Sequence, residues 1–279
     1  METLTRSASI RDRVRAWRAA GRRIALVPTR GTLHKGHMRL VAEAQERADQ
    51  VIVSRCANPP QREAPMLEAD RELLAKIGPD LLFIPPIQEI FPSGSDSSAL
   101  VTLPSLEGIL DGAFRPPGYF GALSTVLVKL FNIVQPDAAV FGERDFQELV
   151  IVRRLVDELF LSIEIVGCPI MRDGDGLALA TANRDLTREE RALAPRLYAA
   201  LGQIGTKIDA GRRDYAALER EGAGLLDAAG FSTEYFAIRQ PSDLAPVGAT
   251  ARELIILAAA RLPRSRVCDN LRVNLIERH

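Results

Sequence analysis

Two histidines lie close together in one glycine-containing segment of this chain. His34 and His37 belong to residues 28–37, which read Pro-Thr-Arg-Gly-Thr-Leu-His-Lys-Gly-His. An apolar run at 24–27 precedes the segment, and an amphipathic stretch from Met38 follows it. A strand, a glycine loop and a helix start in that order form a phosphate site from backbone N–H groups. Two imidazoles there could stabilise charge on a transferring phosphoryl group, so the segment predicts a nucleotide-using enzyme.

Other interpretations of this loop fit less well. An ordinary polar helix cap is the alternative that the pattern alone leaves open. Two histidines with no Cys, Asp or Glu partner nearby supply too few ligands for zinc, so no metal-ligating residues are predicted. Gly31 and Gly36 have the spacing of a P-loop, but His37 and Met38 stand where Lys and Ser/Thr are required. No G-x-G-x-x-G follows the first apolar run, which disfavours a dinucleotide enzyme.

Two further polar clusters follow apolar runs. Residues 141–148 read Phe-Gly-Glu-Arg-Asp-Phe-Gln-Glu, and residues 58–61 read Asn-Pro-Pro-Gln. Arg144 could neutralise phosphate charge, and Asp145 could orient the phosphate or bind it through magnesium. Gln61 could hold a polar group of a substrate. A charged turn before a helix and a simple turn are the alternatives for the two clusters.

Apolar runs and helical patterns alternate through the first two thirds of the chain. The expected strands are 24–27, 51–54, 81–84, 138–141 and 163–166, and the expected helices are 36–48, 67–77, 124–134 and 145–159. This alternation predicts an α/β fold with a parallel sheet and helices on both faces. Ligands of such sheets bind at the carboxyl ends of the strands, so the histidine loop and residues 142–145 should meet at one edge.

The remaining segments have a different texture. Residues 91–121 are rich in Pro, Gly and Ser and predict an excursion over the active-site edge, with a short hairpin near 100–103. After Asn183 we expect a capping box at 187–190, helices at 189–202, 214–229 and 251–261, and a strand at 233–239. These patterns divide the chain into a nucleotide-binding domain, 1–183, and a smaller α+β domain, 184–279.

Composition limits the class of protein. The chain has 279 residues with 47% hydrophobic and 26% charged residues and no formal net charge, so no basic surface argues for nucleic acid. Its three cysteines are far apart and form no zinc or disulfide pattern, which favours a reducing compartment. No signal peptide and no apolar run of about 18 residues is visible. We therefore expect a cytoplasmic protein that does not bind membranes.

Taken together, these clusters carry a family resemblance over nearly the full chain. The chain resembles the pantothenate synthetases (pantoate–β-alanine ligases). The stretches that support the resemblance are Val-Pro-Thr at 27–29 with His-x-Gly-His at 34–37, Asn-Pro-x-Gln at 58–61, Ser-Thr-Val at 124–126, Lys-Leu-Phe-Asn at 129–132, Gln-Pro-Asp at 135–137, Phe-Gly-Glu-x-Asp-Phe-Gln at 141–147, Gly-Leu-Ala-Leu at 176–179 and Asp-Asn at 269–270.

The resemblance implies a fold and a reaction. It implies a Rossmann-type domain of the HIGH nucleotidyltransferase group, a smaller C-terminal lid domain and a homodimer. In the family's reaction, the pantoate carboxylate attacks the α-phosphorus of ATP with Mg²⁺ present, and the β-alanine amine then displaces AMP from the pantoyl adenylate. By position, the implied catalytic residues are His34, His37 and Arg144; the implied ATP-binding residues are His34, Gly36, His37, Gly142, Arg144, Asp145 and Thr181; and the acid substrate is assigned to Arg30, Gln61 and Glu148.

Some departures from the family's motifs fall on residues that bind the ATP phosphates in the family, and they are expected to weaken that binding. The Lys of Gly-Glu-Lys-Asp is Arg144 here, which keeps the charge but not the shape. The family's Ser-Ser-Arg-Asn is Ala-Thr-Ala-Asn here. Ala182 therefore removes a cation and Ala180 a hydroxyl, whereas Thr181 keeps one hydroxyl. Loss of one such charge-assisted contact costs on the order of 1.5–3 kcal/mol, roughly ten- to hundredfold in rate.

Other departures surround the acid pocket. Arg30, Arg55, Arg62 and Glu148 stand where the family has apolar or neutral residues. Charge beside a gem-dimethyl acid costs desolvation, so these residues pair with one another or bind a more polar substrate. Three interpretations therefore stay open: a pantothenate synthetase with a divergent site, a paralogue that performs the same chemistry on another acid or amine, and a weakly active or inactive member with a binding role.

Overall fold

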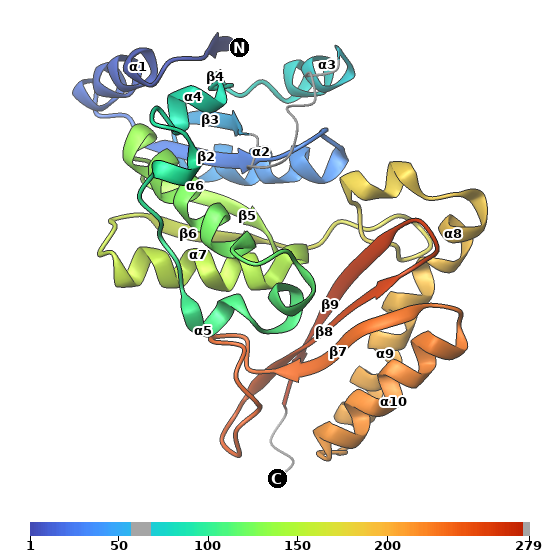
Figure 1. Cartoon of the computed structure of the whole chain (residues 1–279). Helices are drawn as coiled ribbons and strands as arrows, with labels where there is room; N and C mark the ends of the chain where they lie inside the picture. The colour runs from blue at the N-terminus through green and yellow to red at the C-terminus, as the bar shows by residue number, and fades with distance from the viewer. Residues whose placement is uncertain (57–67, 276–279) are drawn as a thin grey trace. The chain divides into compact units, whose positions relative to one another are not determined.

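The structure is a computed structural model that describes residues 1–56 and 68–275 (Figure 1). Contacts between residues divide the chain into two compact units. The first unit comprises Met1–Glu143 and Ile151–Pro169, and the second comprises Arg144–Val150 and Ile170–His279. The chain therefore enters the second unit briefly after Glu143, returns to the first, and leaves it again after Pro169.

The first unit is built on a six-stranded sheet in the order β1-β4-β3-β2-β5-β6. Its strands are β1 (Glu2–Leu4), β2 (Ile24–Thr29), β3 (Gln50–Arg55), β4 (Leu81–Phe83), β5 (Ala138–Gly142) and β6 (Glu164–Cys168). All five pairs of neighbouring strands are parallel. The predicted parallel α/β sheet is thus confirmed, and the five expected strands match β2 to β6 within two residues at each end.

The order of the strands creates a switch point between β2 and β5. From β2 the chain adds β3 and then β4 on one side, and it later adds β5 and β6 on the other side of β2. In parallel sheets of this kind, ligands bind at the carboxyl ends of the strands beside such a switch point. The histidine loop follows β2, and Gly142 ends β5, so both lie at this edge.

Burial explains why these strands could be recognised. Residues 24–27 of β2 are all fully buried, because a central parallel strand is covered on both faces. On one face, Ala25 and Val27 pack against Val41 of α2 and Leu74 of α3 in one core cluster. The helices of this unit are α1 (Ser7–Ala19), α2 (Lys35–Arg47), α3 (Glu68–Ile77), α4 (Ile87–Ile90), α5 (Pro104–Glu107), α6 (Tyr119–Val134) and α7 (Phe146–Glu158), the last shared with the second unit.

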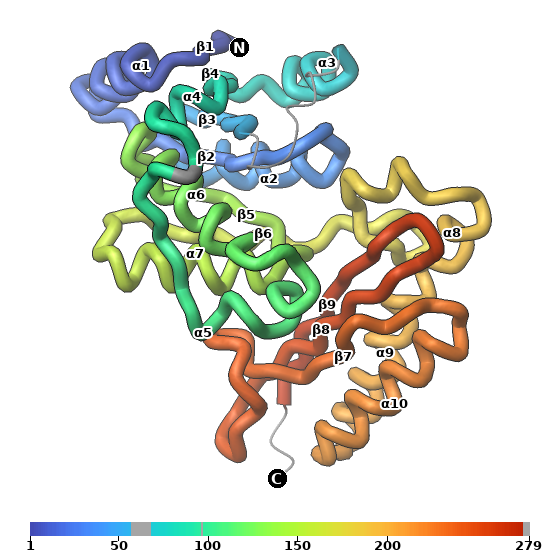
Figure 2. Tube along the Cα trace, viewed as in Figure 1, coloured from blue at the N-terminus to red at the C-terminus, as the bar shows by residue number. Residues whose placement is uncertain are grey.

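The excursion before α6 contains no hairpin in the residues that the structure describes. It consists instead of short helical turns, including η1 (Ser95–Ser97) and η2 (Leu110–Phe114). Figure 2 traces the part of this segment from α5 to α6. The prediction of a hairpin near 100–103 is wrong, because the backbone of this segment is hydrogen-bonded to a side chain of α6. Val101 N–H donates to Thr125 Oγ1 on α6 at 2.9 Å, so a helix side chain takes the place of a second strand.

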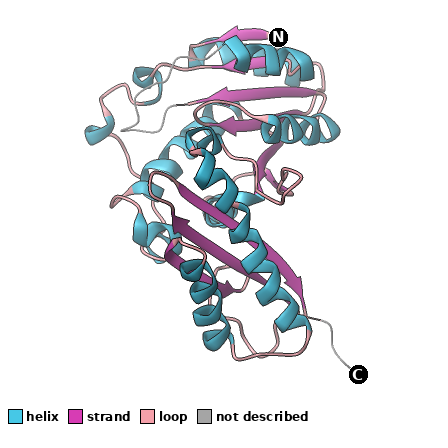
Figure 3. Cartoon of the chain, turned by 90° about the vertical axis from the view of Figure 1, so that its right-hand side faces the viewer, coloured by secondary structure: helices cyan, strands magenta, loops and turns pink. Residues whose placement is uncertain are grey.

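The second unit is an antiparallel sheet covered by helices. Its elements are η3 (Glu143–Asp145) at the junction of the units, η4 (Thr181–Asp185), α8 (Arg188–Leu193), α9 (Pro195–Asp209), α10 (Tyr215–Ala228), β7 (Ser232–Arg239), β8 (Glu253–Arg261) and β9 (Arg266–Asn274). The helices α9 and α10 lie along the sheet β7-β8-β9, and one core cluster joins them (Figures 1 and 3). Gly222 on α10 permits close packing, since a Cβ there would meet the Phe236 ring at 2.4 Å. The smaller α+β part is confirmed.

One element of this unit was predicted with the wrong type. The expected helix at 251–261 is the strand β8, and residues 254–260 of it are all buried. The run Leu-Ile-Ile-Leu-Ala-Ala-Ala suits a helix by propensity, but a central strand shows the same unbroken apolar pattern. The capping box is confirmed, because Thr187 Oγ1 accepts from Glu190 N–H and Glu190 accepts from Thr187 N–H. Among the described residues, no helix is long and apolar enough to cross a membrane.

Candidate active site

The histidine loop begins where β2 ends, and its neighbours hold its shape. Thr29 Oγ1 donates to the carbonyl of Ser54 on β3 at 2.9 Å, which ties the end of β2 to the next strand. Gly31 has a φ of 66°, a left-handed conformation that favours glycine. Leu33 is almost fully buried and anchors the loop in the core below the sheet edge.

A buried carboxylate on α3 supports the same loop. Asp70 is 1% exposed, and its Oδ1 accepts the backbone N–H of Leu33 at 3.0 Å. Its Oδ2 is also buried and accepts no hydrogen bond from the described residues. Sequence reasoning missed Asp70, because a contact across 37 positions leaves no local signal. The carboxylate thus holds the loop one residue before the first histidine.

The two imidazoles cap the helix α2 together. His34 is the N-cap residue of α2, and its Nδ1 accepts the backbone N–H of Gly36 at 3.1 Å. His37 lies one turn later, and its Nδ1 accepts the backbone N–H of His34 at 3.1 Å. The ring centroids are 4.1 Å apart. This arrangement is a capping box in which histidines take the roles usually held by Ser/Thr and Glu/Gln.

The capping box determines which ring nitrogen can donate. A nitrogen that accepts a backbone N–H carries a lone pair, so a neutral ring in this arrangement has its proton on Nε2. We therefore assign the Nε2–H tautomer to both His34 and His37. Each ring then uses Nδ1 for the helix cap and carries its proton on Nε2, and an N–H donor of this type suits a phosphate oxygen.

Two guanidinium groups lie beside the histidine loop. Arg30 Nη1 donates to the hydroxyl of Tyr119, the first residue of α6, at 3.1 Å. Arg55, at the end of β3, donates from Nε to the carbonyl of Gly31 at 3.1 Å. This edge of the sheet therefore carries two cations within one loop region. Gln61, the other residue assigned to the acid substrate here, lies outside the described residues, as does Arg62.

In the second unit, Arg144 and Asp145 form an ion pair. Arg144 Nη2 donates to Asp145 Oδ2 at 2.8 Å and to Oδ1 at 3.1 Å. Burial lowers the pKa of Arg144, but the charges of Asp145, Cys268 and Glu148 and the hydrogen bond to Asp145 raise it further, so the net pKa lies above its usual value. Arg144 is therefore a permanent cation. Arg144 interacts with both Asp145 and Glu148, whose roles toward ATP and the acid stay predictions.

Residues of β9 complete this cluster, and their part in it was missed. The side chain of Asn270 donates from Nδ2 to the carbonyl of Arg144 at 3.1 Å. Cys268 Sγ lies 3.8 Å from Asp145 Oδ1 and donates to it. The signal available in the sequence was the Asp-Asn pair, two polar residues inside an otherwise alternating strand.

Thr181 begins the helical turn η4 in the same unit. Asn183 holds this turn, because its Nδ2 donates to the carbonyl of Ala178 at 2.8 Å. Ala182 is exposed. In the first unit, Gly142 ends β5 and is half-buried. The predicted site residues thus form two groups, one around His34 in the first unit and one around Arg144 in the second.

The side chains available as metal ligands limit how a metal ion could be bound. Within residues 1–56 and 68–275, no group of three or more His, Cys, Asp or Glu side chains could hold a metal ion. Magnesium is commonly held by one or two carboxylates together with substrate phosphates and water, rather than by a protein cage. The described residues are compatible with an ion that arrives with a nucleotide.

Comparison with known proteins identifies the family. The family model described as pantoate–beta-alanine ligase matches residues 2–272. The chain belongs to the pantoate–beta-alanine ligase family. A pantothenate synthetase of Nitrosococcus oceani is 43% identical over 283 aligned positions that cover 99% of both chains. The resemblance read from the sequence is therefore confirmed.

Solved structures of the family share the fold. A pantothenate synthetase of Thermus thermophilus is 36% identical with a TM-score of 0.86 and covers 97% of this chain and 99% of its own. A pantoate–beta-alanine ligase of Francisella tularensis, complexed with beta-gamma ATP and beta-alanine, is 26% identical with a TM-score of 0.77 and covers 97% of both chains. Both likenesses cover 97% of this chain, so its fold is shared with these solved members of the family.

Proposed function

We propose that the protein is an ATP-dependent ligase that joins pantoate to β-alanine. Membership of the family and the 43% identical pantothenate synthetase support this activity. The structural observation that carries the proposal is the reciprocal cap of His34 and His37, which holds two imidazoles at the start of α2, just beyond the carboxyl end of a central parallel strand. A helix cap alone has no physical need for two imidazoles, because Ser, Thr or Glu would serve.

The reaction would proceed in two balanced steps. First, a carboxylate oxygen of pantoate attacks the α-phosphorus of ATP, the bond to the β-phosphate oxygen breaks, and pyrophosphate leaves. Second, the β-alanine amine attacks the acyl carbon of the pantoyl adenylate, loses a proton and displaces AMP. His34, His37 and Arg144 would stabilise the negative charge that moves onto phosphate oxygens in the first step. Gly36, Gly142, Asp145 and Thr181 are the further residues that we assign to ATP.

We propose that Mg²⁺ enters with ATP. It would supply charge neutralisation on the phosphates. Asp145 is the carboxylate that, from the sequence, could bind phosphate through magnesium. Both of its oxygens, however, accept hydrogen bonds from Arg144. We accordingly assign no metal-ligating residues to the protein.

The charged residues that we assign to the acid substrate support a second candidate function. Arg30, Gln61 and Glu148 are the residues that we assign to the acid. The contact of Arg30 with Tyr119 and the contact of Arg55 with Gly31 keep two guanidiniums at this edge. Such charge suits an acid with a second carboxylate or another polar group better than an apolar one. The same adenylation chemistry on a more polar acid is therefore the alternative that these contacts favour.

One assay separates these functions. Pyrophosphate release from ATP and Mg²⁺ is measured with pantoate plus β-alanine, and in parallel with a panel of small hydroxy, amino and dicarboxylic acids. Release that depends on pantoate supports the proposed ligase. Release only with another acid makes Arg30 and Glu148 specificity residues. No release with any acid, together with no ATP binding by calorimetry, leaves the family member with a binding role.

We further propose a homodimer in the cytoplasm. The dimer rests on the family resemblance, and light scattering of the purified protein in solution tests it: a mass of twice 30.6 kDa is expected, and a mass of 30.6 kDa would refute it. The compartment rests on the sparse and widely separated cysteines of the sequence, Cys56, Cys168 and Cys268. Burial raises the pKa of the Cys168 thiol, which keeps it protonated and unreactive.

A further inference from the structure

A buried ion pair in the second unit joins two segments far apart in the sequence. Arg172 donates from Nη1 to Asp269 Oδ2 at 2.5 Å and from Nη2 to Asp269 Oδ1 at 2.9 Å. The side chain of Asp269 is 4% exposed, and that of Arg172 is 18% exposed. A two-pronged pair of this kind holds both partners in one orientation, which a single contact does not.

Arg172 also stabilises the hairpin formed by residues 172–178. Its guanidinium lies 3.5 Å from the centroid of the Tyr198 ring, and Nη1 donates to the carbonyl of Gly176 at 3.0 Å. Arg172 pairs with Ala178 across the hairpin. The next residues lead directly to Thr181, and Asn183 closes the turn back onto Ala178. Arg172 therefore fixes the hairpin 172–178, and the turn that begins at Thr181 is hydrogen-bonded to the end of this hairpin.

Asp269 is linked to the other side of the cluster through Asn270. Asp269 Oδ1 accepts the backbone N–H of Asn270 at 2.8 Å, and Asn270 Nδ2 donates to the carbonyl of Arg144 at 3.1 Å. Both residues are 5% exposed. This series of contacts therefore connects the backbone of Arg144, the predicted phosphate-binding residue, with the turn that begins at Thr181.

We propose that Arg172, Asp269 and Asn270 are positioning residues that hold the Arg144 loop and the Thr181 turn at a fixed separation for the phosphates of ATP. The proposal deepens the proposed function and rests on it for the identity of the nucleotide. The physical reason is that Arg144 and Thr181 belong to segments without a direct backbone ladder between them. A shift of about 1 Å in one group can cost on the order of 100-fold in rate, so a preorganised site needs such support.

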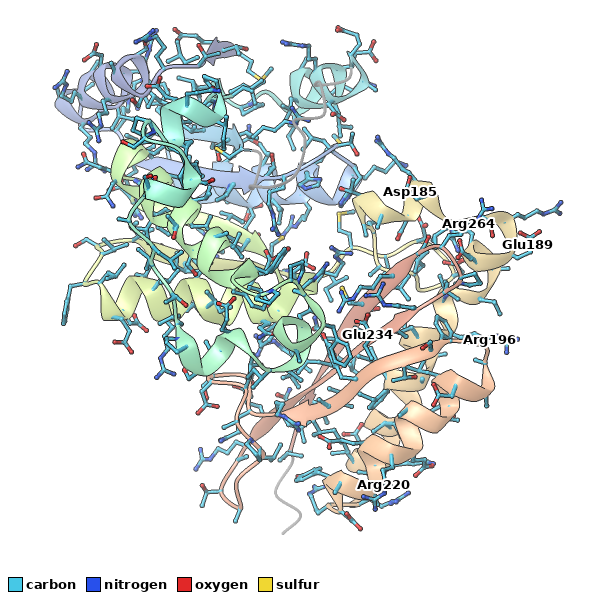
Figure 4. The ribbon with its side chains drawn as sticks, in the orientation of Figure 1. Asp185, Glu189, Arg196, Arg220, Glu234 and Arg264 are labelled. Atoms are coloured by element: carbon cyan, nitrogen blue, oxygen red, sulfur yellow. The ribbon has the colours of Figure 1, made fainter. Side chains whose placement is uncertain are left out.

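A merely structural role for the pair is the competing explanation. It predicts that variants unfold more easily but that the folded enzyme handles ATP normally. A matched control is Glu234, labelled in Figure 4, on β7. Glu234 is another buried carboxylate in the same unit, and it pairs with Arg266 at 2.7 Å and with Arg261 at 2.6 Å beside the β8–β9 hairpin. The Glu234→Gln variant therefore loses a comparable ion pair without touching Arg144 or the Thr181 turn.

The experiment compares Asn270→Ala, Asp269→Asn and Glu234→Gln in the full chain. For each folded variant we measure kcat, the KM values for ATP and β-alanine, the calorimetric Kd for ATP, and hydrogen exchange of peptides covering 142–150 and 176–185. We expect Asn270→Ala and Asp269→Asn to lower kcat/KM for ATP at least tenfold, to leave the KM for β-alanine within about twofold, and to speed exchange in both peptides. Glu234→Gln should change only the thermal midpoint.

The outcomes also separate this proposal from the proposed function. If all three variants change ATP kinetics and exchange equally, the effect is not specific to the contacts of Arg172, Asp269 and Asn270, and the proposal is overturned. If the wild type uses no pantoate but Asn270→Ala still weakens ATP binding and loosens 142–150, the ligase assignment fails and the positioning role stands. If Asn270→Ala changes neither exchange nor ATP affinity, the positioning role is refuted whatever the substrate. Asn270→Ala removes the hydrogen bond to the carbonyl of Arg144 and leaves both side chains of the Arg172–Asp269 ion pair in place, so the test does not depend on whether Asp269→Asn folds.

Discussion

The backbone N–H of His34 donates to Nδ1 of His37, so the second imidazole closes the helix turn that the first one begins. The two nitrogens of each imidazole ring therefore have different hydrogen-bonding roles. Nδ1 satisfies a backbone donor that the start of a helix leaves without a partner, and the proton of the neutral ring is on Nε2. Stability and catalysis can therefore be separated at this position by substitution.

We predict that His37→Gln keeps the helix cap and loses the chemistry. Gln at the third helical position can accept the same N–H of the N-cap residue, as in ordinary capping boxes. His37→Ala should lose both roles. We expect turnover to fall at least about tenfold in both variants, which corresponds to about 1.4 kcal/mol, but we expect only His37→Ala to lose about 1 kcal/mol of unfolding free energy.

Urea unfolding and pyrophosphate release measure the two effects separately. Wild-type turnover in His37→Gln would show that Nε2–H does not act in the reaction. A stability loss in His37→Gln equal to that of His37→Ala would show that the reciprocal cap is not what stabilises this loop.

A second prediction concerns the cation that the family's motif has and this chain lacks. Ala182 is exposed in η4, so a longer side chain fits there without displacing a core residue. Ala182→Arg should lower the KM for ATP roughly tenfold, because one charge-assisted contact to a phosphate is worth about 1.5–3 kcal/mol. Ala182→Gln is the control for side-chain length. Equal effects of Arg and Gln would mean that charge is not the reason, and a higher KM in Ala182→Arg would place the triphosphate elsewhere.

The fold could be predicted from its most buried strands. Residues 24–27 and 138–141 are short, apolar and flanked by helical patterns, which is what parallel strands covered on both faces require. The helix α1 was missed although Ile10 and Val14 form its buried face, because its many charged residues obscured the pattern. The strand β8 was predicted as a helix because three alanines follow its aliphatic residues.

Candidate site residues could be proposed from the sequence only where they are close together along the chain. The histidine loop and the 141–148 cluster are such segments, and their residue types are the basis on which phosphate chemistry is predicted. The strand β9 was missed because Asp269 and Asn270 are buried and polar, which breaks the alternation of a half-buried strand. Partners such as Arg172 and Asp269 are 97 positions apart, and no local pattern reports that contact. The domain boundary at residue 183 stays a prediction.

A third prediction concerns Glu148, which lies half-buried on α7 near Arg144. If the substrate is pantoate, a second carboxylate nearby repels it, so Glu148→Gln should lower the KM for pantoate severalfold at low ionic strength. The length and shape of the side chain are kept, so a packing change cannot explain the gain. The KM for ATP in the same variant is the internal control. A higher KM for pantoate, or a shift of preference to another acid, would instead make Glu148 a residue that recognises an ammonium or hydroxyl group.

The last prediction tests how Asp70 supports the histidine loop. Asp70→Ala leaves the buried N–H of Leu33 without its acceptor, and such a loss costs about 1–3 kcal/mol of unfolding free energy. Asp70→Asn keeps an acceptor oxygen and removes a buried charge whose second oxygen has no partner among the described residues, so its stability should equal or exceed that of the wild type. Because Leu33 precedes His34, turnover should fall in Asp70→Ala and persist in Asp70→Asn. Thermal unfolding and pyrophosphate release on both variants check this pair. If Asp70→Asn abolishes turnover while remaining folded, the negative charge itself serves the reaction, and support of the loop would no longer be a sufficient account of this carboxylate.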